Sequence, residues 1–102
     1  MNNLLIIDSD PTPDNIVRYK NRLKTLRRNN HQLYVFLEKR GVQWLNDLIW
    51  EQVYHPDVIF YVQATDAWDY PVTFKSDVIF SGQQTLQQLM ASAENIEKMI
   101  DR

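Results

Sequence analysis

A short, unbroken apolar segment, Leu4-Leu5-Ile6-Ile7, lies near the start of the chain and ends in the polar sequence Asp8-Ser9-Asp10-Pro11-Thr12-Pro13. A continuous apolar run bounded by turn residues is typical of a β-strand that is covered on both faces. We therefore predict an interior strand at 4–7. Ligands of open α/β sheets bind beyond the carboxyl ends of the strands, so we expect the 8–13 loop to lie on the functional edge.

The rest of the chain alternates between helical spacing of apolar residues and short apolar runs. The predicted helices span about 15–28, 42–53 and 83–93, and further strands are predicted at 32–37, 58–62 and 77–80. Residues 63–75 are predicted to be irregular, and 95–100 form either an edge strand or a helical tail. This order implies right-handed crossovers and a three-layer α/β sandwich with a four- or five-stranded, mainly parallel sheet.

The predicted helices have distinct inner and outer faces. Thr12 or Asp14 is expected to cap the first helix, and Asn29-Asn30 to close it. The residues expected to face the core are Ile16, Tyr19, Leu23 and Leu26 in the first helix, Leu45, Leu48 and Ile49 in the second, and Leu86, Leu89, Met90 and Ala93 in the last. The outer face of the first helix is basic, with Arg18, Lys20, Arg22, Lys24, Arg27 and Arg28. Such a face either meets an acidic partner or RNA or is simply solvated.

Composition limits the functions that are possible. A chain of 102 residues with 44% hydrophobic and 24% charged residues is expected to form a single globular domain over residues 1–102. A net charge of −2 argues against a dedicated nucleic-acid binder. The absence of cysteine excludes disulfides, thiolate metal sites and cysteine catalysis, and fits a cytoplasmic protein. The first apolar run is too short for a signal peptide or a membrane span.

Two stretches resemble domains of the DsrE/DsrF-like family. Residues 77–96 contain a short strand, Gly82, a helix with the pattern Leu86-x-x-Leu89, a small residue and a last short segment. Residues 34–45 contain a hydrophobic strand followed by the step Gly41-Val42 and a helix. With the matching order of elements, the resemblance spans nearly the whole chain. It implies a small α/β domain that assembles into homo-oligomers, or into hetero-oligomers with related subunits.

The same resemblance bears on chemistry at the end of the third predicted strand. Some members of the family relay persulfide sulfur through a cysteine there, and in one branch Cys-Thr-Asp stands where this chain has Ala64-Thr65-Asp66. The nucleophile is therefore missing here. The family also contains subunits without the cysteine, which serve as structural partners of active ones. We expect a non-catalytic protein of this kind, with no catalytic residue, metal or cofactor, and possible membership of a sulfur-relay complex.

Polar residues at two strand ends form the candidate cleft: Asp8, Ser9, Asp10, Gln63, Ala64, Thr65 and Asp66. Asp8 and Asp10 could hold Mg²⁺, as in phosphoacceptor receiver domains, or could cap the following helix. A receiver also needs an aspartate at the end of the third strand, where this chain has Gln63. The second group, 63–66, could bind a small ligand or a partner's sulfur-carrying residue, or could satisfy its own backbone.

Large aromatic side chains form a candidate interface, because such residues are enriched in the centres of protein interfaces. They are Trp44, Trp50, Trp68 and Tyr70. The alternative is that they complete the core of the chain itself, and Trp68 is the one whose irregular, polar surroundings favour an interface or pocket. His31 and His55 lie in different turns without other ligands at metal-site spacing, and they predict no metal site.

Three functional hypotheses therefore follow from the sequence. The first is a non-enzymatic, oligomeric DsrE-like protein that acts by binding subunits or partners. The second is a small-ligand-binding domain that uses the loop edge. The third is a degenerate receiver-like signalling domain.

Overall fold

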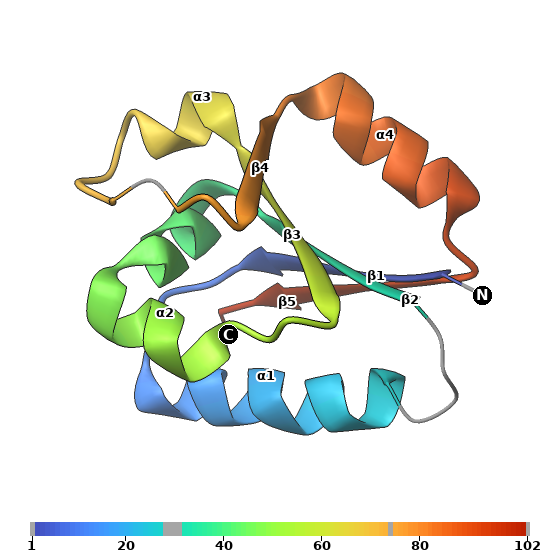
Figure 1. The fold of residues 1–102 in the computed structure, drawn as a ribbon, viewed down its shortest axis with the longest axis horizontal. Coiled ribbons are helices and arrows are strands. Elements are labelled where there is room, and N and C mark those ends of the chain that lie inside the picture. The colour runs from blue at the N-terminus through green and yellow to red at the C-terminus, as the bar shows by residue number, and fades with distance from the viewer. Residues whose placement is uncertain (1, 28–31, 74, 102) are drawn as a thin grey trace.

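The computed structural model describes residues 2–27, 32–73 and 75–101 (Figure 1). In chain order the elements are β1 (Asn2–Asp8), α1 (Pro13–Leu26), β2 (Gln32–Leu37), the 3₁₀ helix η1 (Lys39–Leu45), α2 (Asp47–Val53), β3 (Val58–Gln63), α3 (Ala64–Ala67), β4 (Val78–Ser81), α4 (Gln83–Ser92) and β5 (Asn95–Ile100). The five strands form one sheet in the order β4-β3-β2-β1-β5, and every neighbouring pair is parallel. The predicted α/β class and the interior position of the first strand are confirmed.

Helices cover both faces of the sheet, which explains the unbroken apolar run of β1. Its side chains alternate between the faces, so that Leu5 and Ile7 join the core beneath α1, η1 and α2, while Leu4 and Ile6 pack against Leu86 of α4. Figure 1 shows α1 and α2 on one side of the sheet and α4 on the other. No helix in the described ranges combines the length and apolar character needed to cross a bilayer.

The start of α1 follows from its cap. The Thr12 hydroxyl accepts a hydrogen bond from the Asn15 amide at 3.2 Å, and Pro13 occupies the first helical turn, where its missing N–H costs nothing. The helix therefore begins two residues before the predicted start. Its inner face is buried as predicted at Ile16, Tyr19 and Leu23. The predicted closing pair, Asn29-Asn30, lies outside the described residues.

The predicted helix 42–53 is wrong as a single element, because the chain forms η1 and then α2. Asn46 stands between them with extended backbone angles, and its side chain accepts a hydrogen bond from the Leu48 amide at 3.1 Å. This break rotates the following residues about the helix axis. Leu48, predicted to face the core, is consequently 74% exposed, whereas Leu45 is fully buried.

The remaining differences lie in the second half of the chain. The segment predicted to be irregular begins with the one-turn helix α3. The ambiguous 95–100 segment is the edge strand β5, which pairs with β1. In α4, Leu86 is buried and Leu89 and Ala93 pack beside it, but Met90 points outward and is exposed.

Candidate functional site

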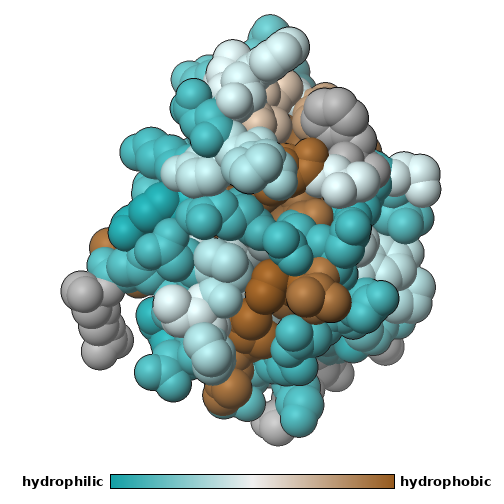
Figure 2. All heavy atoms as spheres, turned by 90° about the vertical axis from the view of Figure 1, so that its left-hand side faces the viewer, coloured by the Kyte–Doolittle hydropathy of each residue, from teal (hydrophilic) through white to brown (hydrophobic). Residues whose placement is uncertain are grey.

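The carboxyl ends of the parallel strands meet at one edge of the sheet, where the sequence predicts the functional site. Figure 2 faces this edge and shows a mainly hydrophilic surface interrupted by apolar patches. The candidate cleft residues do lie here, but η1 separates them into two groups. The Arg40 amide donates to Asp8 Oδ1 at 3.4 Å, and the Lys39 amide donates to Asp66 Oδ2 at 2.8 Å. The two groups therefore do not form a single cleft.

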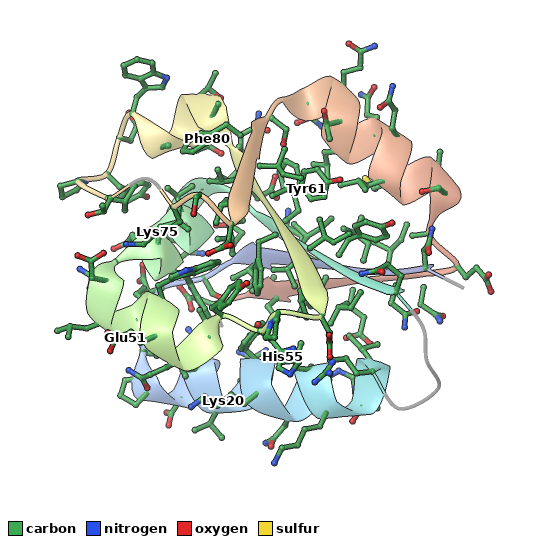
Figure 3. All side chains as sticks on the ribbon, viewed as in Figure 1. Lys20, Glu51, His55, Tyr61, Lys75 and Phe80 are labelled. Carbon is green, nitrogen blue, oxygen red and sulfur yellow. The ribbon has the colours of Figure 1, made fainter. Side chains whose placement is uncertain are left out.

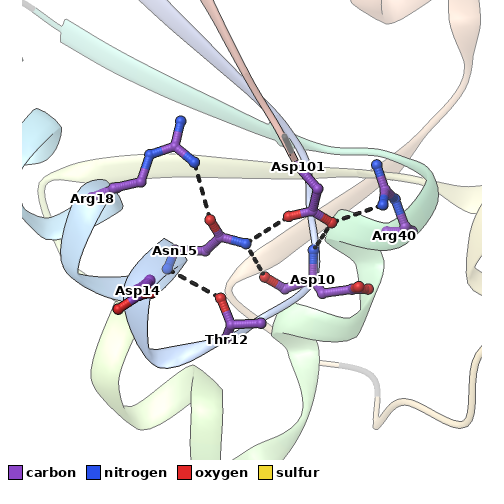
Figure 4. A pocket seen from close by; sticks show the side chains of 7 residues that line it. All are labelled: Asp10, Thr12, Asp14, Asn15, Arg18, Arg40 and Asp101. Carbon is purple, nitrogen blue, oxygen red and sulfur yellow. Dashed lines mark hydrogen bonds and ion pairs between the residues drawn. The ribbon is translucent and has the colours of Figure 1, made fainter.

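The first group borders an open hollow of about 700 Å³ at the ends of β1 and β5 (Figure 4). Its lining residues are polar or charged: Asp10, Thr12, Asp14, Asn15, Arg18, Arg40 and Asp101. Asp101 connects the parts of this hollow. Its carboxylate accepts hydrogen bonds from the Asp10 amide at 3.1 Å and from Asn15 Nδ2 at 2.7 Å, and it lies 2.8 Å from Arg40 Nη1.

The other polar groups of this hollow also satisfy one another. Asn15, which is buried, donates to the Asp10 carbonyl at 2.8 Å and accepts from Arg18 Nη1 at 3.1 Å. Asp10 Oδ1 accepts from Gln43 Nε2 at 2.8 Å, and the buried Asp8 carboxylate lies 3.5 Å from Arg40 Nε. The aspartates thus hold η1 and the strand ends together, whereas Thr12 caps α1.

Asp101 is a site residue that the sequence analysis missed. The residue follows β5, so its position beside Asp10 becomes visible only once the 95–100 segment is known to pair with β1. The hydrogen bond from the Asp10 amide, supported by Asn15 and Arg40, lowers the pKa of Asp101 below its ordinary value of 3.8. The ionised carboxylate is therefore the form that the folded structure favours.

This pKa shift predicts a pH-dependent stability. Because the pKa is lowered in the folded state, Asp101 stabilises the fold above pH 3.8, and the contribution is lost as the pH falls through the folded-state pKa. Asp101→Asn should therefore lower the free energy of unfolding at neutral pH, and the difference from wild type should shrink in acid. Urea unfolding at a series of pH values from neutral to acid measures this difference in the free energy of unfolding. Asp69→Asn, at an exposed position, is the control. An equal deficit at every pH would contradict the assignment.

The second group surrounds α3 at the end of β3. A small apolar cavity of about 110 Å³ lies here between Ala64, Ala67, Trp68 and Phe80, and Figure 3 shows Phe80 beside α3. We call these four residues the α3 surface. Trp68 is 87% exposed on its rim. Gln63 comes directly before α3, and its Oε1 is buried without a hydrogen-bond partner in the described part of the chain.

The four candidate interface aromatics separate clearly in the structure. Trp44 and Trp50 are buried in the core of the chain itself, which corrects the prediction that they face a partner. Trp44 Nε1 donates to the Ser9 carbonyl at 2.8 Å, and Trp50 packs edge-on against Phe60 with the ring centres 4.8 Å apart. Tyr70 is partly buried against the same core. Trp68 alone of the four is strongly exposed.

The described basic side chains of the first helix and its end lie in solvent or form ion pairs or hydrogen bonds, and Arg28 lies outside the described residues. Lys20 extends away from the sheet (Figure 3), while Arg22 forms an ion pair with Glu97 and Arg27 forms one with Asp57. His55 Nδ1 accepts a hydrogen bond from an amide in its own turn, and His31 lies outside the described residues. Across the residues that the structure describes, no three acidic or histidine side chains gather as a metal site would require.

Comparison with known proteins gives a structural match. No family model matches the chain, and no curated protein matches it in sequence. Among solved structures, the crystal structure of the YchN protein from E. coli matches with a TM-score of 0.70 and 15% sequence identity. The match covers 97% of this chain and 100% of the YchN chain. The chain therefore shares its α/β fold with YchN over nearly its whole length.

Proposed function

We propose that this chain is a non-catalytic subunit of an oligomeric DsrE-like assembly and that it binds a partner chain through the α3 surface. One observation carries the proposal: Trp68 is 87% exposed on the rim of an apolar cavity at the carboxyl edge of the sheet. Tryptophan is enriched among the residues that contribute most to protein–protein binding, and such residues act beside pockets from which water is excluded. An apolar side chain of a partner would fill the cavity and cover the indole.

The chemistry around this surface suits recognition better than catalysis. Ala64 stands where one branch of the DsrE-like family has its cysteine, and the structure places it in the first turn of α3, on the cavity wall. Methyl and indole groups provide neither a nucleophile nor a proton donor at this point of the cavity. We propose that the partner is a related subunit that carries the missing cysteine, so that the assembly belongs to a sulfur-relay system.

The native mass of the assembly tests this proposal. The tagged protein is purified from its own cells, and every co-purifying chain is identified by mass spectrometry. The expected result is a stoichiometric complex with a related, cysteine-bearing chain. A chain that remains monomeric at high concentration and retains no partner would contradict the proposal, and a partner unrelated to this family would remove the sulfur-relay part.

The open hollow at the ends of β1 and β5 supports a second candidate function, the binding of a small polar ligand. Arg18 and Arg40 line it together with Asp10, Asp14 and Asp101, so a ligand would need both cationic and anionic groups. Its polar side chains already bond to one another, which makes this candidate the weaker one, because a ligand must replace those bonds. Thermal shift with a panel of zwitterionic metabolites tests it, and no shift with any of them would exclude it.

The third hypothesis, a degenerate receiver domain, has less support. Asp8 and Asp10, the candidate Mg²⁺ ligands, accept hydrogen bonds from Arg40 and Gln43 of η1. A cation at this position would have to displace both contacts.

A further inference from the structure

Among the residues that the structure describes, no strand pairs with the outer edge of β5. The sheet order ends with β5, which bonds to β1 on one side only. The Glu38 amide donates to the Ile7 carbonyl at 3.0 Å, so the odd-numbered residues of β1 turn their backbone groups toward β2 and the even-numbered ones toward β5. Leu4 and Ile6 have Ile96 and Lys98 as their Cα partners, so the groups that bond to β1 belong to Asn95, Glu97 and Met99. The N–H and C=O groups of Ile96, Lys98 and Ile100 therefore point outward. Such an edge is a template for pairing with another strand.

The side chains of β5 favour one particular partner. On the face shared with α4, Ile96 and Ile100 are 43% and 50% exposed, and they flank Lys98 on either side. This arrangement is symmetric about Lys98. We infer that β5 pairs antiparallel with β5 of a second copy of this chain, about a twofold axis at Lys98, so that the two sheets become continuous. The inference concerns a surface separate from the α3 surface and does not depend on the proposed partner.

The register about Lys98 is the one that the side chains support. It places each Ile96 opposite Ile100 of the second copy, and it places Glu97 opposite Met99 of the second copy. Ile96, Lys98 and Ile100 point their backbone groups outward, so the Lys98–Lys98 pair and the two Ile96–Ile100 pairs can exchange hydrogen bonds between the chains. An axis at Glu97 would instead oppose two glutamates, and an axis at Met99 would oppose Glu97 and Asp101.

Repulsion between the two Lys98 side chains is the main argument against this register, because they would face each other across the axis. Each amine, however, lies 3.0 Å from Oε1 of the largely buried Glu38 in its own chain. This ion pair neutralises the charge within each copy and holds the amine toward the sheet. The outer edge of β4, by comparison, belongs to a strand of only four residues and offers less backbone for pairing.

Disulfide trapping tests the inference directly, because the chain has no cysteine of its own. Lys98 would face its counterpart in a hydrogen-bonded pair, with Cα atoms about 5.5 Å apart, which is within disulfide range. Oxidised Lys98→Cys should therefore form covalent dimers at least about tenfold faster than Ile79→Cys, an equally exposed position on the other edge strand. Equal rates at the two positions would overturn the proposal.

Two further variants keep the test independent of the Lys98–Glu38 ion pair. The double variant Ile96→Cys/Ile100→Cys retains Lys98 and should also form covalent dimers. Glu97→Cys should react more slowly, because the two positions would be diagonal neighbours about 7–8 Å apart. Faster trapping at position 97 than at position 98 would refute the register.

The unmodified full chain provides the last measurement. Purified alone and at high concentration, it should have twice the mass of one chain or an even multiple of it. Ile96→Pro removes one outward amide and should shift the protein toward monomer, because proline is tolerated on an edge strand where that N–H is unpaired in the single chain. Ile96→Val, which keeps that amide and a branched apolar side chain, should remain dimeric. The inference would be overturned if the wild-type chain were a monomer. It would also be overturned if the β5 amides became protected from hydrogen exchange only when a different protein binds.

Discussion

Replacing Trp44 with alanine is expected to lower the free energy of unfolding by about 3 to 5 kcal/mol. Trp44 is fully buried in η1, and its ring meets Tyr19 edge-on with the ring centres 5.4 Å apart. The substitution would leave a cavity in the core and would remove the donor that the Ser9 carbonyl uses at 2.8 Å. Urea unfolding followed by circular dichroism measures the loss, provided that the slope with denaturant stays unchanged.

Trp68→Ala is the matched control for this prediction. The same chemical change at a side chain that is 87% exposed should alter the free energy of unfolding by no more than about 0.5 kcal/mol. Similar losses at both positions would mean that Trp68 is part of the core, which would contradict the α3 surface. A small loss at Trp44 would contradict the position of η1.

Gly41→Ala is expected to cost about 3 kcal/mol or more, although it adds only one methyl group. A Cβ atom at this position would lie 1.9 Å from the carbonyl oxygen of Ile7 and 2.8 Å from its carbonyl carbon. Ile7 belongs to β1, which is held between β2 and β5, and its carbonyl also accepts a hydrogen bond from the Glu38 amide at 3.0 Å. The strand has no freedom to withdraw, so η1 would have to move away from it.

Gly82→Ala serves as the control, because no atom lies within 4 Å of the Cβ that it would add. Its effect on the free energy of unfolding should stay within about 1 kcal/mol, since alanine restricts the unfolded chain but is a poorer helix cap than glycine. Thermal and urea unfolding of the two variants compare the sites. If Gly41→Ala proved as stable as Gly82→Ala, the close approach of η1 to β1 would be wrong.

The elements that were predictable from the sequence are those whose apolar residues follow one clear periodicity within a short segment. The run of β1 and the face of α1 formed by Ile16, Tyr19 and Leu23 have one periodicity each, and both were predicted correctly. The 42–53 segment has a continuous helical pattern, yet the Asn46 side chain competes for the backbone and divides it. The burial of Trp44 was missed for the same reason, because the direction of its side chain depends on where the helix breaks.

The candidate site was less predictable because its residues meet only through the order of the strands. The sequence placed the ends of the first and third strands on one edge, which is correct. It could not show that η1 would fill the space between Asp8 and Asp66. Nor could it bring Asp101 to Asp10, because that contact depends on the pairing of β5 with β1 rather than on any local motif.

We propose that the chain functions by binding a partner through the α3 surface. The most direct test is the affinity of the purified partner complex in two variants, Trp68→Ser and Leu48→Ser. Both positions carry strongly exposed apolar side chains, but Leu48 lies on α2, away from the cavity residues. We expect at least about tenfold weaker binding for Trp68→Ser and an unchanged affinity for Leu48→Ser. Unchanged binding of Trp68→Ser, in a variant that folds as wild type does, would contradict it.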